Sequence, residues 1–377
     1  MNLTQMVRSV YPNLTPYTCS LADLPVEEMK QALGLEQVYK LSFNENPLGP
    51  SPKAIAAMQQ ALTQLNLYPS SSGEAVLNKI AEKEGVQPQN VILSNGADEM
   101  IILVAQTFLE PEDEAIIPQI CFVQYLASTN LMGAKPVFSP MKEDLGIDLD
   151  GALQKITDKT KVIFLCNPNN PTGTVIPADE LRAFVARVPE NVLVVIDEAY
   201  HEFADGDGYA SSVELTRDFA NVFVIRTFSK VYSLAAARIG YGIGQTELVD
   251  AVNHVRPPFN VNSIAQAGAL ASLDDAEHVA ASRQNNAIGK KLLCDTFDEL
   301  GLTYLKSQAN FVCVDTGRDG KAVFDRLAER GFIVRTLAGY GLKSSLRISI
   351  GREEEMRAFV AAFKEVMQES DLPTIKN

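Results

Sequence analysis

The sequence contains no tryptophan, three histidines and five scattered cysteines, and these shortages narrow the chemistry that it can support. It has no CxxC pair and no histidine–cysteine cluster with metal-ligand spacing, so we predict neither a metal site nor a redox motif. Because His201, His254 and His278 are its only imidazoles, a catalytic triad has few possible members. An odd number of dispersed cysteines is typical of a cytoplasmic protein with reduced thiols.

Basic residues are also in the minority. The chain has 33 Lys and Arg against 47 Asp and Glu, which gives a net charge of −14. This charge argues against nucleic acid or an anionic membrane as the main partner. The most apolar stretch, around residues 100–108, is too short to cross a bilayer, and residues 1–13 lack the apolar core of a signal peptide. We therefore expect a cytoplasmic protein that binds small molecules.

Seven short apolar runs organise the middle of the chain, and helical patterns separate most of them. The runs are apolar throughout rather than alternating, which is typical of strands buried on both faces. Strands joined by helical crossovers favour a doubly wound, largely parallel α/β sheet, whose ligands bind beyond the carboxyl ends of the strands. The predicted strands are residues 91–94, 114–117, 136–138, 162–166, 192–197, 222–226 and 240–244.

After residue 244 the pattern changes to α+β. A long helix is predicted across about residues 276–300, and short strands return after residue 302. The 377 residues are 46% hydrophobic, which is enough for more than one buried core. We predict an N-terminal arm that begins the small domain (1–45), a large domain (46–270) and a small C-terminal domain (271–377).

The stretch Val222–Gly244 places a lysine at the mouth of a predicted buried strand. Lys230 follows the turn residues Thr227 and Ser229, and Arg238 comes eight residues later, at the end of a helix-like SLAAAR segment. A buried ammonium is costly unless it is paired or used chemically. An amine beside two hydroxyls and an arginine favours a nucleophile next to a phosphate. For FSK in isolation, a partly exposed loop lysine is the ordinary alternative.

Polar residues follow other predicted strands as well. The segment Ser94–Glu99 opens a helix whose free N–H groups could bind a phosphate, although an ordinary helix cap explains it equally. The turn Asn167–Thr174 is made rigid by two prolines and holds an amide suited to a phenolate oxygen. Asp197 ends a predicted strand, where a buried carboxylate is costly unless a cation such as a protonated pyridine meets it. Tyr200, three residues later, could reach the same ligand. The alternative is that Asp197 only caps the next helix.

Two arginines stand out in the C-terminal part of the chain. Arg347 interrupts the apolar run LRISIG, and Arg335 precedes it by twelve residues. A guanidinium in an apolar strand is a suitable fork for a carboxylate or phosphate. An outward-facing strand position is the alternative for both residues.

Together these motifs resemble the fold-type I pyridoxal-phosphate aminotransferases. The ordered set is NPNNPTG, DEAY, TFSK with an arginine eight residues after the lysine, and LRISIG. Within that family, NLTPY at 13–17, FNENPLGPSP, LYP at 67–69, NGADE and RPPFNVNS at 256–263 are similar to the histidinol-phosphate aminotransferases. The resemblance spans nearly the whole chain. It implies an α/β large domain with a seven-stranded, mostly parallel sheet, a smaller α+β domain and a homodimer.

The resemblance also implies roles for individual residues. Lys230 would carry pyridoxal phosphate covalently and later move a proton, while Asp197 would keep the pyridine nitrogen protonated. Asn170 and Tyr200 would bind the ring oxygen, and Phe122 would stack on the ring. The residues implied around the cofactor phosphate are Ala97, Asp98, Thr227, Ser229, Arg238 and Tyr68 of the partner subunit. Those implied in substrate binding are Arg335, Arg347, Asn44 and Tyr17.

The sequence departs from the family pattern in three places. Phe122 keeps an aromatic ring, but Ile120 and Cys121 replace the usual residues before it. Ala236 replaces the glycine of an L-A-G-x-R motif, a change that a helix would tolerate. Ser70 stands where an acid is common, which bears on the choice of substrate rather than of cofactor.

We therefore expect a metal-free aminotransferase that converts histidinol phosphate and 2-oxoglutarate to imidazole-acetol phosphate and glutamate. An aromatic amino-acid aminotransferase and a decarboxylase on the same scaffold are alternatives within the cofactor class. A ligand-binding protein without catalytic activity is the alternative outside it, since fold alone does not fix function.

Overall fold

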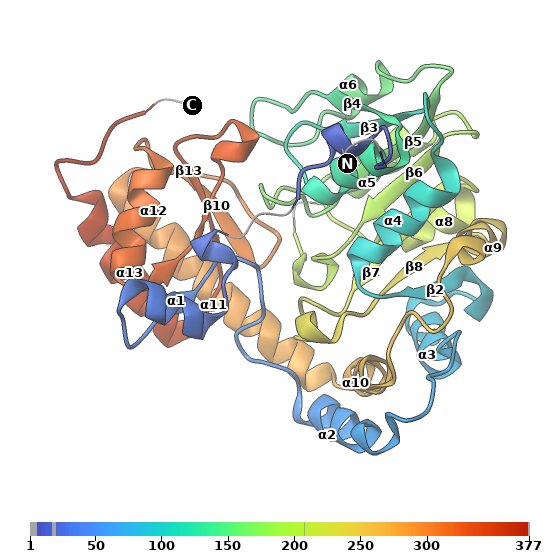
Figure 1. Cartoon of the computed structure of the whole chain (residues 1–377). Coiled ribbons are helices and arrows are strands. Elements are labelled where there is room, and N and C mark those ends of the chain that lie inside the picture. Colours follow the sequence, from blue (N-terminus) through green and yellow to red (C-terminus); the bar gives the residue numbers. More distant parts are fainter. Residues whose placement is uncertain (1–5, 17–19, 207, 376–377) are drawn as a thin grey trace.

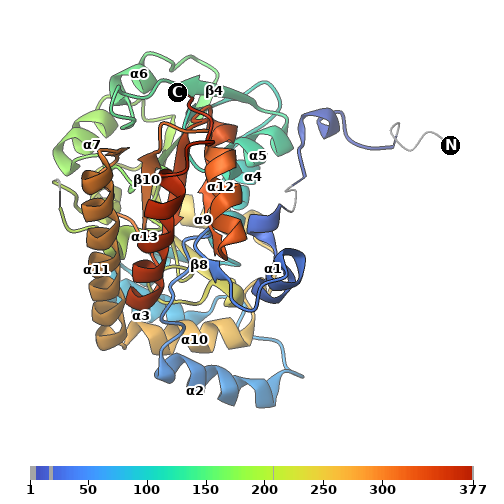
Figure 2. The ribbon, with the colours of Figure 1, turned by 90° about the vertical axis from the view of Figure 1, so that its left-hand side faces the viewer.

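The computed structural model describes residues 6–16, 20–206 and 208–375, which form two lobes (Figure 1). The larger lobe contains the central sheet, and the smaller lobe combines the C-terminal helices with α1 (Val26–Leu33) near the N-terminus. The long helix α11 (Ala276–Leu300) begins near the foot of the larger lobe and enters the smaller one. Figure 2 shows residues 6–16 extending to one side of the molecule. Over the described residues, no helix combines the length and the apolar character needed to cross a membrane.

The larger lobe is built on a sheet of order β2-β8-β7-β6-β5-β3-β4, seven strands within the described ranges. Neighbours from β7 to β4 are parallel, whereas β8 is antiparallel to both β7 and β2. This confirms the predicted, largely parallel α/β sheet. The strands are β2 (Val91–Ser94), β3 (Glu114–Pro118), β4 (Lys135–Ser139), β5 (Thr160–Cys166), β6 (Leu193–Asp197), β7 (Val222–Thr227) and β8 (Gly240–Gly244).

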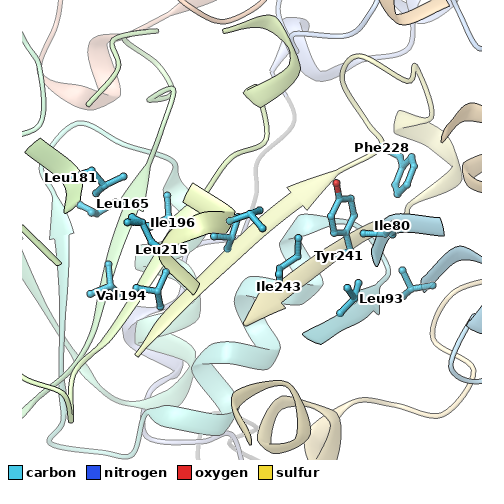
Figure 3. Close-up of a cluster of buried hydrophobic side chains, with 14 of the residues drawn as sticks. Ile80, Leu93, Leu165, Leu181, Val194, Ile196, Leu215, Phe228, Tyr241 and Ile243 are labelled. Atoms are coloured by element: carbon cyan, nitrogen blue, oxygen red, sulfur yellow. The ribbon is translucent and has the colours of Figure 1, made fainter. Parts of the chain in front are cut away.

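Helices cover both faces of this sheet because successive strand residues point to opposite sides. In β5, Ile163 and Leu165 join one hydrophobic cluster, and Phe164 and Cys166 join the other. Figure 3 shows part of the first cluster, where Leu181 approaches Leu165. The first face carries α3 (Glu74–Glu84), α6 (Leu149–Leu153), α7 (Ala178–Val185), α8 (Leu215–Asp218) and α10 (Ser263–Leu273), against which α2 (Pro52–Ala61) packs. The second face carries α4 (Ala97–Phe108), α5 (Val123–Met132) and α9 (Thr246–Val255).

The smaller lobe has its own hydrophobic core, to which both ends of the chain contribute. Met29 of α1 lies in the same buried cluster as Phe359 and Phe363 of α13. An antiparallel sheet of order β12-β13-β10-β9 and a parallel pair β1-β11 support it. The strands are β1 (Tyr39–Lys40), β9 (Thr303–Tyr304), β10 (Phe311–Asp315), β11 (Phe332–Ile333), β12 (Arg335–Thr336) and β13 (Ser345–Ser349), and the remaining helices are α12 (Gly320–Glu329) and α13 (Glu353–Met367). The domain limits expected from the sequence stay a prediction.

One local prediction is wrong. The SLAAAR segment was expected to be helical, but it forms only a 3-10 turn at Ala235–Ala237. Ser233 and Arg238 on either side have φ of 59° and 58°, in the left-handed region that a continuing helix does not allow. The helical preference of alanine is therefore overridden by contacts of Arg238 elsewhere in the fold.

Candidate active site

A cavity of about 920 Å³ opens at the carboxyl ends of β5, β6 and β7, where the two lobes meet. It brings together nearly all the side chains singled out in the sequence, although they come from seven separate segments. The predicted residues that line it are Asn44, Ala97, Asp98, Phe122, Asn170, Asp197, Tyr200, Thr227, Ser229, Lys230, Arg238, Arg335 and Arg347. Tyr68 does not line it, and Tyr17 lies outside the described residues.

Lys230 projects into this cavity directly after β7. Its Nζ donates a hydrogen bond to the backbone oxygen of Phe43 at 3.1 Å and lies 5.6 Å from the centre of the Tyr200 ring. Burial, followed by the positive charge of Arg347, lowers the pKa of the Lys230 ammonium to about 8. A lysine with this pKa is partly neutral near physiological pH, so its amine can act as a nucleophile and as a proton carrier.

Asp197 is the buried anion of the cavity and is 2% exposed. Its Oδ2 accepts a hydrogen bond from the Tyr125 hydroxyl at 2.7 Å, and its Oδ1 accepts one from the Ala199 backbone N–H at 3.0 Å. Burial raises the pKa of Asp197 to about 6, against the lowering effect of these two hydrogen bonds. Both of these donors are neutral, so they do not balance the negative charge of the carboxylate. A cationic group of a ligand would balance it.

The start of α4 and the turn after β7 line another part of the cavity. Arg238 donates to the Ala235 oxygen at 3.0 Å and pairs with Asp98 at 3.2 Å. Gly96 has φ of 84°, and a β-carbon there would come within 2.4 Å of an Arg238 Nη atom. The absent side chain therefore leaves room for the guanidinium beside the first N–H groups of α4. This combination is suited to a phosphate.

Two hydroxyls complete this end. Thr227 donates from Oγ1 to Ser229 Oγ at 3.0 Å, and the Ser229 backbone N–H donates to Thr227 Oγ1 at 3.1 Å. Both residues are buried and line the cavity next to Lys230. The pyridoxal phosphate expected from the sequence fits the site: the anion-binding end, the amine and the buried carboxylate match its phosphate, aldehyde and pyridine nitrogen.

Asn170 and Tyr200 are held by side chains of the smaller lobe. Arg347 donates to Asn170 Oδ1 at 2.6 Å, which orients the Asn170 amide nitrogen away from the guanidinium. Asn44, with φ of 57°, donates to the Tyr200 hydroxyl oxygen at 2.9 Å and accepts from the Ser349 hydroxyl at 2.8 Å. Asn44 therefore positions Tyr200 in addition to lining the cavity.

Arg335, on β12 of the smaller lobe, also lines the cavity. It pairs with Arg347 across β12 and β13, so both side chains leave the same face of that sheet. Its Nη1 donates to Asp23 Oδ1 at 3.0 Å. Both guanidinium groups line the cavity from the smaller lobe.

Sequence reasoning missed two groups that support the site. Tyr125 follows Phe122 by three residues, and its contact with Asp197 was not anticipated. Arg226, 1% exposed, makes ion pairs with Glu198 at 2.7 Å and Glu84 at 2.8 Å beneath the ends of β6 and β7. The sequence contained a signal in both cases. Arg226 lies in the predicted buried strand VFVIRT and needs an anionic partner, and the two acids of DEAY need groups that donate hydrogen bonds or carry positive charge.

Known proteins are similar to this chain over nearly its whole length. The family model for aminotransferase class I and II matches residues 36–363. A histidinol-phosphate aminotransferase of Nitrosococcus oceani is 40% identical over 365 residues, covering 97% of this chain and 98% of that protein. One from Pseudomonas fluorescens is 42% identical over 368 residues, covering 97% and 98%.

Solved structures agree with this similarity. Histidinol-phosphate aminotransferase from Sinorhizobium meliloti, in complex with pyridoxal-5'-phosphate, superposes with a TM-score of 0.85 at 28% identity, covering 95% of this chain and 99% of that one. Aspartate aminotransferase from Thermus thermophilus with maleate gives 0.82 at 24% identity, covering 96% and 99%, and this likeness concerns the fold alone.

Proposed function

Because the chain belongs to the class I and II aminotransferase family, we propose that it transfers the amino group of L-histidinol phosphate to 2-oxoglutarate. The observation that supports this choice is that Arg335 and Arg347 leave one face of the smaller lobe's sheet and line the cavity, in addition to the anion-binding end near Gly96. Two anion sites together with an amine and a carboxylate suit a phosphorylated cofactor and an anionic substrate. The relatives' names indicate histidinol phosphate as that substrate.

The protein is a pyridoxal-phosphate-dependent aminotransferase. When bound, the cofactor supplies an aldehyde for condensation with amino groups and a ring that withdraws electrons from the substrate's α-carbon. Lys230 would hold the cofactor and then move the α-proton, a role for which a pKa of about 8 is suitable. Asp197 would hold the pyridine nitrogen, and Asn170 and Tyr200 the ring oxygen.

The remaining cavity residues would orient this group. The α4 N-terminus at Ala97 and Asp98, with Thr227, Ser229 and Arg238, would bind the phosphate. Phe122 begins α5 at the cavity wall and would cover one face of the ring. Arg335 and Arg347 would bind the phosphate of the amino donor or, in the second half-reaction, the carboxylate of glutamate or 2-oxoglutarate.

A donor screen tests the proposed substrate. The purified holoenzyme is assayed with 2-oxoglutarate and either L-histidinol phosphate or L-phenylalanine. We expect kcat/KM for histidinol phosphate to exceed that for phenylalanine by about tenfold or more, because a phosphate carries more negative charge and more acceptor oxygens for Arg335 and Arg347 than a carboxylate does. An Arg335→Met variant should lose most of this preference. A preference for phenylalanine, or turnover that does not require the keto acid, would contradict the assignment.

We propose in addition that the protein is a homodimer. Tyr68 is 83% exposed and stacks on Phe259, with ring centres 4.8 Å apart. Further exposed apolar side chains lie on α2 and between α2 and Tyr68, at Ile55, Leu62, Leu65 and Leu67. An apolar surface of this kind is typical of subunit interfaces, and Tyr68 would then reach the cavity of the other subunit.

The dimer is testable by mass. Sedimentation equilibrium should give about twice the chain mass of 41.1 kDa. A Leu65→Glu, Leu67→Glu double variant should shift the protein to monomer and weaken cofactor binding, because charge would be buried in the interface. Phe138→Glu, at an exposed apolar residue of β4, is the matched control and should remain dimeric. A monomeric wild-type protein would disprove the proposal.

The described cysteines are unpaired, which supports the expected cytoplasmic location, and fractionation of source cells would test it.

A further inference from the structure

The chain segment that follows β1 contacts both a proposed anion-binding arginine and the reactive amine before it reaches Glu45. The backbone oxygen of Ser42 accepts from Arg347 at 2.5 Å, and that of Phe43 accepts from Lys230 at 3.1 Å. Glu45 follows two residues later and lines the same cavity. Because three residues of chain span at most about 10 Å, Glu45 lies near both of these contacts.

The residues on either side of Glu45 are tethered to the rest of the site. Before it, the backbone N–H of Asn44 donates to the Ser349 hydroxyl at 2.8 Å. After it, the side-chain nitrogen of Asn46 donates at 2.9 Å to the backbone oxygen of Val231, the residue that follows the reactive lysine. The backbone at Glu45 is therefore held in a fixed position relative to the reactive amine.

The Glu45 carboxylate itself is held less closely. Lys40 Nζ lies 3.4 Å from Glu45 Oε1, and the Glu45 side chain is 45% exposed. Hydrogen bonds between ammonium and carboxylate groups are usually about 2.7–2.9 Å long, so this pair is loose. The other described acids that line the cavity have closer partners: Asp23 with Arg335 at 3.0 Å, Asp98 with Arg238 at 3.2 Å, Asp197 with Tyr125 at 2.7 Å and Asp325 with Lys321 at 2.6 Å.

A carboxylate in this place can distinguish the rings of the two candidate donors. Histidinol phosphate carries an imidazole, which has a ring N–H, whereas the phenyl ring of phenylalanine has no hydrogen-bond donor. Both rings are aromatic and can pack against apolar side chains, so packing alone separates them little. A site that accepts a hydrogen bond from one ring discriminates against the ring that cannot donate it.

We propose that Glu45 is a specificity-determining residue that accepts a hydrogen bond from the ring N–H of an imidazole-bearing amino donor. This inference rests on the proposed aminotransferase function and names the group that recognises the donor's ring. With its anionic group at Arg335 and Arg347 and its amino-bearing carbon at Lys230, the donor would place its ring beside Glu45. A phenyl ring there would remove water from the carboxylate without replacing the lost hydrogen bond.

Glu45→Leu tests the proposal because leucine removes both acceptor oxygens. The holoenzyme is mixed with L-histidine or L-phenylalanine, which share the α-carboxylate and differ only in the ring, and the half-reaction is followed by cofactor absorbance. The kcat/KM for histidine divided by that for phenylalanine should fall about tenfold or more. KM for histidinol phosphate should rise by a similar factor. Glu45→Gln keeps one acceptor oxygen and should give an intermediate fall.

Donor preference is the decisive readout because Glu45 also affects the reactive amine. Burial and Arg347 lower the pKa of Lys230, and Glu45 opposes them. This influence acts on the lysine whichever donor is used. Binding alone is measured with two analogues that lack the amino group, 3-(imidazol-4-yl)propionate and 3-phenylpropionate. In Glu45→Leu, the dissociation constant of the imidazole compound should rise about tenfold relative to that of the phenyl compound.

Methylated histidine tests the ring N–H directly. At pH 8 the imidazole is neutral and has a single N–H, which methylation of a ring nitrogen removes. Methylation should therefore lower kcat/KM by about tenfold or more in the wild-type protein, but by less than about threefold in Glu45→Leu, where the acceptor is already absent. A structural defect in the variant would not remove the effect of the methyl group.

Glu180→Leu is the matched control. Glu180 is also exposed and pairs with a lysine, Lys142 at 3.2 Å, but it does not line the cavity, so the donor ratio should stay within about twofold of wild type. The proposal is wrong if Glu45→Leu leaves the donor ratio unchanged or weakens both donors equally. If Glu45→Leu does not fold, Glu45→Gln and the methylated donors give the same decision. Failure of the wild-type protein to transaminate any donor would instead overturn the proposed function.

Discussion

Replacing Lys230 with alanine is expected to lower the transamination rate by about 10⁴-fold or more while the protein remains folded. The amine is the group proposed both to attach the cofactor and to move the α-proton, and its pKa of about 8 suits both tasks. In the structure it is held by the Phe43 backbone oxygen rather than by a carboxylate, so no buried anion is left unpaired when it is removed. The fold should therefore tolerate the change.

Two measurements check this prediction. Borohydride reduction of the wild-type holoenzyme should attach the cofactor to the peptide that contains Lys230, whereas the Lys230→Ala protein should show no attachment by mass spectrometry. Lys83→Ala is a useful control because Lys83 also approaches a tyrosine ring, Tyr232 at 5.1 Å, but does not line the cavity. Normal turnover by Lys230→Ala would disprove the proposed function.

Asp197→Asn should produce the second-largest loss, roughly 10²- to 10⁴-fold in kcat/KM. Asparagine keeps the shape of the side chain but removes the charge that would hold a protonated pyridine nitrogen. A hydrogen bond to a charged group contributes about 1.5–3 kcal/mol, so cofactor affinity should also fall by about 10- to 100-fold at pH 8. Equilibrium dialysis of the cofactor measures this loss separately from activity.

The pH dependence gives a sharper test of the same residue. Because the pKa of Asp197 is raised to about 6, the carboxyl becomes neutral below that pH in the cofactor-free protein. The advantage of wild type over Asp197→Asn in cofactor affinity should therefore be fully present well above pH 6 and shrink as the pH falls through it.

Tyr125→Phe provides an intermediate case. The Tyr125 hydroxyl donates to Asp197 at 2.7 Å and so stabilises the ionised carboxylate. Its loss should raise the pKa of Asp197 and move the onset of the affinity loss to higher pH. If wild type and Asp197→Asn differ by the same factor from pH 5 to pH 8, Asp197 does not hold a cation in the manner proposed.

The positions of the residues proposed to bind the cofactor could be predicted, because these residues follow buried strands. Asn170, Asp197 and Lys230 come after β5, β6 and β7, and the carboxyl ends of parallel strands meet at one edge of the sheet. Short apolar runs therefore reveal both the strands and the place where polar side chains converge. The backbone at Arg238 was not predicted, because alanine propensity favours a helix there, whereas Arg238 has φ of 58° and its side chain pairs with Asp98 of α4.

The residues proposed to bind the substrate are placed by contacts between distant parts of the chain, and no periodic pattern in the sequence predicts those contacts. Arg335 meets Asp23 across 312 residues, and Arg347 meets Asn170 across 177. These pairs form because the chain's N-terminal segment and C-terminal strands build one lobe that closes against the sheet. The sequence by itself determined the α/β sheet, the lysine and the carboxylate, since strand burial and strand-end chemistry are local properties. Only the tertiary structure decided which charge faces Arg335, because ion pairing depends on distance in space and not on separation along the chain.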